Sequence, residues 1–198
     1  MSKIGDIRKR EIIEAAIEVF GEKGFHRSKM GEIAVKTGIG KGTIYEYFSS
    51  KKELFEEMFK FIVDGYFKGA KEIFDGTESV KSRLIKFSTY HGRFMWSHYE
   101  LAENTLKGSE PVSEGMKVYL WGKKKELFES IKGMLEDGIQ KKELKEGSNS
   151  DEVICMLIGS ISQAYAHGFH KGIKDPDKVD PEPMIELLFR GIGRDNKQ

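Results

Sequence analysis

The chain has 198 residues, with 33 Lys and Arg against 32 Asp and Glu and a net charge of +1. This balance excludes a uniformly basic coat, although residues 1–55 carry 11 Lys and Arg against 8 Asp and Glu. The single cysteine, Cys155, excludes a disulfide within the chain, and no stretch reaches the roughly 18 unbroken apolar residues of a membrane span. We therefore expect a cytoplasmic protein with no membrane partner.

The first predicted element is a supporting helix over residues 6–20, where apolar residues recur at helical spacing. Gly21 and Gly24 should end it, because glycine adopts a left-handed helix cap at little cost. A second helix is expected after Ser28, whose hydroxyl can accept hydrogen bonds from the free N–H groups of the first turn. Gly38 and Gly40 should stop this helix in turn.

A third, short helix is predicted to begin near Lys41, with Ile44 and Phe48 on its inward face. Five residues should lie on its outward face and flanks: Gly42, Thr43, Tyr45, Glu46 and Tyr47. Such a helix suits the DNA major groove, because glycine lets the backbone approach closely and the polar side chains can reach base edges or phosphates.

The next helix starts with the capping sequence Ser50-Lys51-Lys52-Glu53. Two lysines in a first turn oppose the helix dipole unless an anion binds there, as a DNA phosphate would. The same arrangement occurs at the start of the second helix, in Arg27, Ser28 and Lys29. The sequence therefore predicts phosphate contacts at both helix starts.

From Ala16 to Leu54 the chain resembles the DNA-binding signature of the tetracycline-repressor (TetR) family of bacterial transcriptional regulators. The resemblance is carried by the Gly24-Phe25 corner, the Ile33-Ala34 pair, the runs Gly38 to Thr43 and Tyr45 to Phe48, and Lys51. It implies an all-α homodimer of about nine helices. Residues 1–50 would form a three-helix DNA-binding domain with a helix-turn-helix, and residues 51–198 a helical effector-binding and dimerisation domain.

The same resemblance implies particular contacts to double-stranded operator DNA. The contacting residues would be Lys41, Gly42, Thr43, Tyr45 and Tyr47, with Lys51 holding the DNA backbone. Glu46 departs from the family pattern, which more often has an aromatic residue or histidine there. A carboxylate facing DNA is repulsive unless it accepts a hydrogen bond from a cytosine amino group.

Helical spacing continues through the rest of the chain. Helices are predicted over 51–74, 78–107 (one or two), 113–141, 151–172 and 184–192, with a break at 147–150 that caps the fourth of these stretches. The last two are strongly apolar and should need a partner. We expect them to pack against a second copy as a four-helix bundle through Gly159, Ser160, Leu187 and Leu188.

Aromatic side chains with polar tips predict a pocket for a small-molecule effector in the second domain. The candidate lining residues are Tyr90, Phe94, His98, Trp121, Phe128 and Tyr165. These rings can equally fill an ordinary core, and the sequence does not identify the effector.

Other chemistries fit the sequence poorly. Gly38 to Thr43 lacks the Gly-Lys-Ser/Thr of a phosphate-binding loop, and its glycine spacing differs from the dinucleotide motif. Two pairs of histidines, with two nearby carboxylates, could hold a metal: His91 and His98, His167 and His170, Glu100 and Glu103. Ordinary hydrogen-bonded histidines are the favoured interpretation, because no compact metal-ligand motif occurs. We therefore expect no metal and no cofactor.

Two functions from different classes remain. The leading hypothesis is a ligand-responsive DNA-binding transcriptional regulator, a repressor released from a palindromic operator by a small molecule. The alternative is a helical enzyme that binds a small molecule or metal and carries the N-terminal motif incidentally. The sequence has no Gly-x-Ser-x-Gly nucleophile motif, and Cys155 is better explained as a small core residue, so an enzyme is not favoured.

Overall fold

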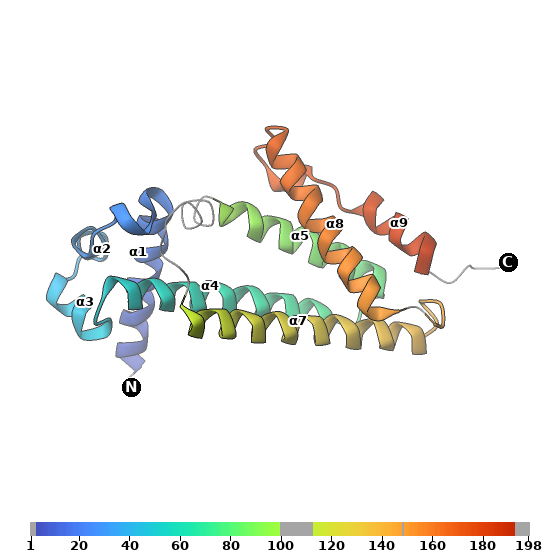
Figure 1. Cartoon of the computed structure of the whole chain (residues 1–198), viewed down its shortest axis with the longest axis horizontal. Coiled ribbons are helices and arrows are strands. Elements are labelled where there is room, and N and C mark those ends of the chain that lie inside the picture. The colour runs from blue at the N-terminus through green and yellow to red at the C-terminus, as the bar shows by residue number, and fades with distance from the viewer. Residues whose placement is uncertain (1–2, 100–112, 148, 193–198) are drawn as a thin grey trace. The chain divides into compact units, whose positions relative to one another are not determined.

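The computed structural model describes residues 3–99, 113–147 and 149–192, and within these ranges the secondary structure is helical without strands. The elements are α1 (Lys3–Arg27), α2 (Met30–Thr37), α3 (Lys41–Tyr47), α4 (Lys51–Phe74), α5 (Val80–Ser97), α7 (Glu114–Gln140), α8 (Ser150–His170), a short 3-10 helix (Pro176–Lys178) and α9 (Glu182–Ile192) (Figure 1). The all-α prediction is confirmed. The predicted helix over 51–74 agrees with α4 at both ends.

Glycines and capping side chains set most helix ends as the sequence predicts. Gly38 has a φ of 69° and closes α2 in the left-handed conformation. Gly24, with a φ of 73°, interrupts α1, whereas Gly21 lies within the helix, so the expectation that Gly21 ends it is wrong. Ser50 Oγ accepts a hydrogen bond from the Glu53 N–H (3.1 Å) at the start of α4. Asn149 caps α8, which confirms the predicted break before it.

The chain separates into two compact units. The first contains residues 3–65, 98–99 and 113–119 of the described chain, and the second contains 66–97, 120–147 and 149–192. The helices α4 and α7 each contribute residues to both units. The functional division at residue 50 remains a prediction.

The first unit has a small apolar core built by α1, α2, α3 and the first half of α4. Its largest fully buried side chains are Ile12, Phe20, Ile33, Ile44, Phe48, Leu54 and Met58, each no more than 1% exposed. Each helix contributes at least one of them, because apolar residues three or four apart share a helix face. The short α3 is therefore fixed to its neighbours by its inward face.

The second unit has a larger core, in which α5 packs against α8 and α9 (Figure 1). Its fully buried residues include Leu84, Phe87, Ile131, Leu135, Leu157, Ile161 and Ile185. Among the described helices, none combines the length and apolar character needed to cross a membrane.

Candidate DNA interface and effector region

The short helix α3 presents a polar face to solvent. Ile44 is fully buried and Phe48, which caps the helix, is 1% exposed, so the predicted inward face is confirmed. The opposite face carries the exposed residues Lys41, Gly42, Tyr45 and Glu46, with Thr43 and Tyr47 half-buried beside them. Groups that can donate or accept hydrogen bonds are thus displayed on a rigid element, as base recognition in a groove requires.

Gly42 leaves open space on this face. A Cβ atom built at Gly42 would meet no other atom within 4 Å. Glycine inside a helix lowers stability by about 0.5–1 kcal/mol relative to alanine, so Gly42 does not stabilise α3. The open space at Gly42 leaves room for an external surface to approach the α3 backbone closely.

Glu46 and Lys41 differ in their surroundings. The Lys41 ammonium lies 5.9 Å from the centroid of the Tyr45 ring, which holds it against the α3 surface. Glu46 is exposed and has no ion-pair partner among the residues described. Its carboxylate is therefore free to accept a hydrogen bond from a partner.

Lys51 does not have the position predicted for it. Its ammonium donates hydrogen bonds to the carbonyls of Phe25 (2.8 Å), Ser28 (3.1 Å) and His26 (3.4 Å) and lies 4.3 Å from the centroid of the Phe25 ring. An ammonium group has three N–H donors, so all of them are used within the chain. In this structure Lys51 fastens the turn between α1 and α2 to α4, and its contact with a DNA phosphate stays a prediction.

Ser28 also differs from its prediction. Its side chain is 2% exposed, and its hydroxyl is 2.7 Å from the Gly24 carbonyl and 3.1 Å from that of Val19. The residue before α2 is Lys29, whose N–H donates to the Glu32 carboxylate at 2.9 Å. Ser28 therefore neither caps α2 nor can contact DNA through its side chain.

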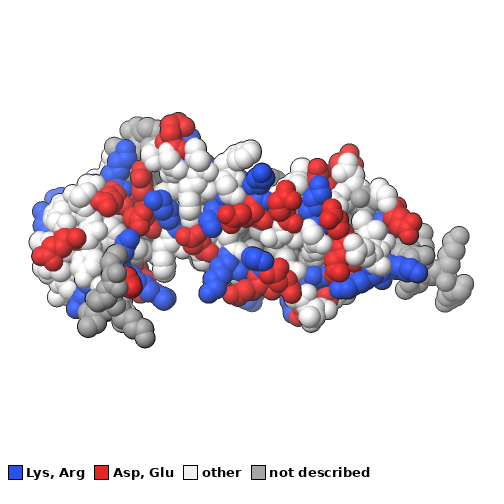
Figure 2. All heavy atoms as spheres, turned by 90° about the horizontal axis from the view of Figure 1, so that it is seen from below, with Lys and Arg blue, Asp and Glu red and all other residues white. Residues whose placement is uncertain are grey.

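The remaining cations at the helix starts are accessible. Arg27 and Lys29 are exposed before α2, and Lys52 is exposed in the first turn of α4. Basic and acidic side chains are intermingled on the face seen in Figure 2, in agreement with the net charge of +1. A phosphate bound at this surface would therefore depend on local cations and free helix N–H groups.

Four of the predicted effector-site residues pack around one apolar cluster in the second unit. Tyr90 and Phe94 of α5 and Phe128 of α7 are half-buried against it, and Tyr165 of α8 belongs to it with 3% exposure. Trp121 is 71% exposed, so its predicted place in an apolar pocket is wrong. A helical pattern does not reveal that this position of α7 points to solvent.

The sixth candidate, His98, does not belong to the second unit. It follows the last residue of α5, is half-buried and belongs to the first unit. Four of the six predicted residues therefore belong to or pack against the apolar cluster of the second unit.

The sequence analysis missed a polar network inside the second unit. The Tyr66 hydroxyl lies 2.7 Å from His91 Nδ1, and His91 Nε2 lies 3.2 Å from Ser162 Oγ. Burial lowers the pKa of His91 to about 4, so the ring is neutral at pH 7 and has one donor and one acceptor nitrogen. Burial also raises the pKa of Tyr66 above its usual value. Their spacing in the sequence, 25 residues apart on different helices, carries no signal of this contact.

His91 thus has ordinary hydrogen bonds, as the favoured interpretation held. Within residues 3–99, 113–147 and 149–192, no three His, Cys, Asp or Glu side chains are grouped as metal ligands. Glu100 and Glu103, considered above as further ligands, lie outside the described residues.

Residues 12–58, which include α2, α3 and their supporting segments, match the model of the family described as bacterial regulatory proteins, tetR family. Over these residues the chain belongs to the TetR family. The matched residues include all of α2 and α3 and the start of α4. The polar face of α3 therefore lies within the region that the family model describes.

Relatives of this TetR-family chain extend over nearly its whole length. It is 27% identical to the fatty acid metabolism regulator protein of Bacillus subtilis (strain 168) over 190 residues, 92% of this chain and 94% of the relative. The solved structure of FadR from Bacillus subtilis in complex with stearoyl-CoA is 27% identical, with a TM-score of 0.70 over 92% of this chain and 98% of that chain. A TetR/AcrR-family regulator from Thermobifida fusca is 26% identical, with a TM-score of 0.74 over 94% and 99%.

These related proteins are transcriptional regulators. The TetR-family chain is accordingly a DNA-binding transcriptional regulator, and the alternative of an enzyme with an incidental motif is not supported.

Proposed function

We propose that this TetR-family regulator is a homodimeric cytoplasmic repressor that binds a palindromic operator and is released by a long-chain acyl-CoA. The observation that carries the proposal is the exposed polar face of α3, with open space at Gly42 and a fully buried Ile44 behind it. One short helix reads only a few base pairs. A two-fold axis would place a second copy about 34 Å away, in the next turn of the major groove.

Within this proposal the contacts divide between reading and positioning. The reading residues are Lys41, Gly42, Thr43, Tyr45, Glu46 and Tyr47 of α3. Phosphates are held by Arg27, Lys29 and Lys52, which replace Ser28 and Lys51 in the sequence-based assignment. Residues 1–50 serve DNA binding, and residues 51–198 serve effector binding and dimerisation.

The dimer interface is proposed on the exposed faces of α8 and α9. Met156 is 63% exposed and Leu187 is 65% exposed, and Gly159 and Ser160 are exposed on α8 beside Met156. Large apolar side chains on a surface are typical of contacts with a partner. Leu188 instead packs half-buried against the core of its own unit, so Leu187 is the better candidate of the predicted pair.

A long-chain acyl-CoA is proposed as the effector on two grounds. The similar regulator FadR from Bacillus subtilis was solved in complex with stearoyl-CoA. The second unit here has an aromatic interior formed by Tyr90, Phe94, Phe128 and Tyr165, with the polar groups of His91 among its residues. Effector sites for small molecules combine such apolar walls with a few polar groups.

The test is an anisotropy titration of labelled DNA from upstream of the protein's own gene, with and without stearoyl-CoA. We expect specific binding without ligand and release by stearoyl-CoA, with free CoA as the matched control. If stearoyl-CoA leaves the operator affinity unchanged while the DNA binds specifically, the acyl-CoA assignment is wrong. If no upstream DNA binds above the level of scrambled DNA, the repressor assignment is wrong.

A further inference from the structure

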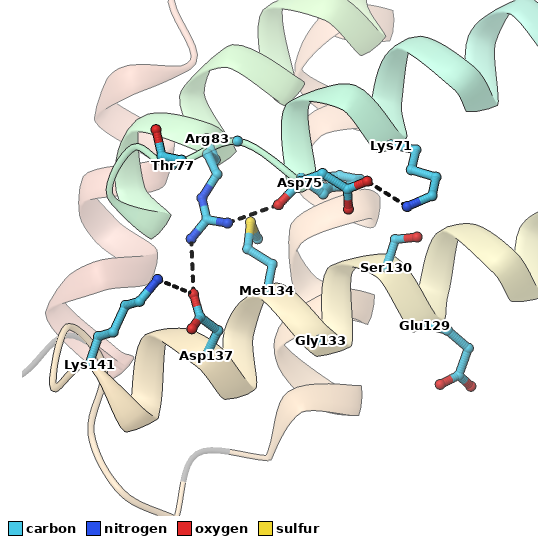
Figure 3. A pocket seen from close by; sticks show the side chains of 12 residues that line it. Lys71, Asp75, Thr77, Arg83, Glu129, Ser130, Gly133, Met134, Asp137 and Lys141 are labelled. Carbon is cyan, nitrogen blue, oxygen red and sulfur yellow. Dashed lines mark hydrogen bonds and ion pairs between the residues drawn. The ribbon is translucent and has the colours of Figure 1, made fainter.

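A pocket of about 640 Å³ opens within the second unit, where the end of α4, the start of α5 and the last turns of α7 meet (Figure 3). Its walls carry three cations and three carboxylates: Lys71, Arg83, Lys141, Asp75, Glu129 and Asp137. The formal charge of the wall is therefore balanced. What distinguishes the pocket is the state of its one buried cation, Arg83.

Arg83 is 4% exposed, and its guanidinium group is only partly satisfied. Nη1 donates a hydrogen bond to the Phe74 carbonyl at 2.8 Å. Nη2 lies 3.8 Å from Asp137 Oδ2, too far for a hydrogen bond, and Nε has no hydrogen-bond partner among the described residues. The edge formed by Nε and Nη2 thus lacks an acceptor, although burying a charge without one is costly.

Arg93 on the same helix shows what this edge normally binds. Its Nε and Nη2 donate to the two carboxylate oxygens of Asp177 at 2.6 Å and 3.0 Å. A planar pair of N–H donors matches a group with two oxygens, such as a carboxylate or a phosphate. The exposed arginine has this bidentate partner, whereas the buried arginine at the pocket does not.

The nearby carboxylates do not fill the vacant edge. Figure 3 shows Asp137 approached by both Lys141 and Arg83, and the Lys141–Asp137 ion pair at 2.7 Å is the shorter of the two. Asp75 is paired with Lys71 at 2.5 Å. These two lysines offset two of the three negative charges, so an entering anion meets less repulsion than the number of carboxylates suggests.

We infer that this pocket is an oxyanion site, in which two oxygens of a phosphate or carboxylate group accept hydrogen bonds from Arg83 Nε and Nη2. The hydroxyl of Thr77, which also lines the pocket, is a further donor. Nε is covered in this structure, so binding includes a small rotation of the guanidinium group toward the pocket. The oxyanion site itself is independent of the proposed function. The further statement that this site receives the phosphates of an acyl-CoA effector rests on the proposed function.

The experiment measures anion binding to the full-length protein without DNA. Isothermal titration with inorganic phosphate, free CoA and decanoate, at constant ionic strength, identifies which oxyanion binds. Arg83→Lys keeps the charge but loses the two-donor edge, and should weaken binding about tenfold or more. Arg93→Lys, which changes an arginine on the same helix outside the pocket, should bind as the wild type does. Asp137→Asn, which removes the opposing carboxylate, should strengthen binding.

Saturation with anion should also shift the Nε–H resonance of Arg83 in the wild-type NMR spectrum. This measurement needs no variant, so it decides the question if Arg83→Lys fails to fold. Equal affinity for Arg83→Lys and wild type, or an unmoved Arg83 resonance at saturating phosphate, CoA and decanoate, would overturn the inference. Phosphate or CoA binding without decanoate binding assigns the site to phosphates, and the reverse assigns it to carboxylates. Anion binding with no operator release by stearoyl-CoA would leave this site standing and reject only the proposed effector.

Discussion

Replacing Gly42 by alanine should make the protein more stable and a poorer DNA binder. The added Cβ meets no atom within 4 Å, so no clash offsets the gain in helix propensity. The free energy of unfolding of the first unit should rise by about 0.5–1 kcal/mol. On DNA the methyl group occupies space needed for close approach. Overpacking by one such group costs about 1–3 kcal/mol, so operator affinity should fall about 5- to 150-fold.

Gly21→Ala is the matched control for this prediction. Gly21 lies within α1, and a Cβ there also meets open space. Its replacement should stabilise the protein to a similar degree and leave operator binding unchanged. Chemical denaturation monitored by far-UV circular dichroism gives the free energies of unfolding, and fluorescence anisotropy gives the operator affinities. Operator affinity of Gly42→Ala equal to that of Gly21→Ala would refute the close approach of α3 to DNA.

Three further predictions concern the lysines at the start of α4, the proposed dimer interface and the buried His91. Lys51→Ala removes the donor to three carbonyls, so it should lower the thermal stability and leave the salt dependence of DNA affinity unchanged. Lys52→Ala should leave the thermal stability unchanged and reduce the slope of log affinity against log salt concentration by about 1. Leu187→Asp should give monomers in sedimentation analysis and keep the wild-type stability. Leu188→Asp should also lower the stability, because the Leu188 side chain packs on the core. Dimers of Leu187→Asp would exclude the proposed interface. Burial lowers the folded-state pKa of His91 to about 4, so the unfolded chain binds the proton more readily. The free energy of unfolding should therefore have its full value above about pH 6.5 and fall by up to about 3 kcal/mol toward pH 4. A wild-type pH profile of stability no steeper than that of His91→Gln would contradict this.

The parts of the fold that depend on local pattern could be predicted from the sequence. The bounds of α4, the cap at Ser50 and the inward face of α3 follow from residue spacing and capping chemistry. Lys51 could not be predicted in this way, because its contacts are carbonyls 23 to 26 residues earlier in the chain. A lysine in a first turn has the same sequence pattern whether its long side chain reaches outward or folds back.

The candidate effector region shows the same limit. The aromatic residues of α5, α7 and α8 are evident in the sequence, but which of them face the core depends on how the helices pack. Trp121 is therefore exposed, while Tyr165 lies where a Cβ on Gly92 would collide with it. The Tyr66–His91–Ser162 network joins three helices, and Arg83 of α5 lies between Phe74 of α4 and Asp137 of α7. Such tertiary contacts have no signature in the order of residues.

The central claim, that α3 reads base sequence, is tested most directly by the affinities of wild type and Tyr45→Ala for the operator and for a scrambled duplex of equal length. Tyr45 is 44% exposed on α3, so its removal should cost little stability. Losing a base contact should weaken operator binding about 5- to 150-fold and leave binding to the scrambled duplex nearly unchanged. Lys52→Ala, as the phosphate control, should weaken both duplexes equally. An equal loss on both duplexes for Tyr45→Ala would contradict a reading role for α3.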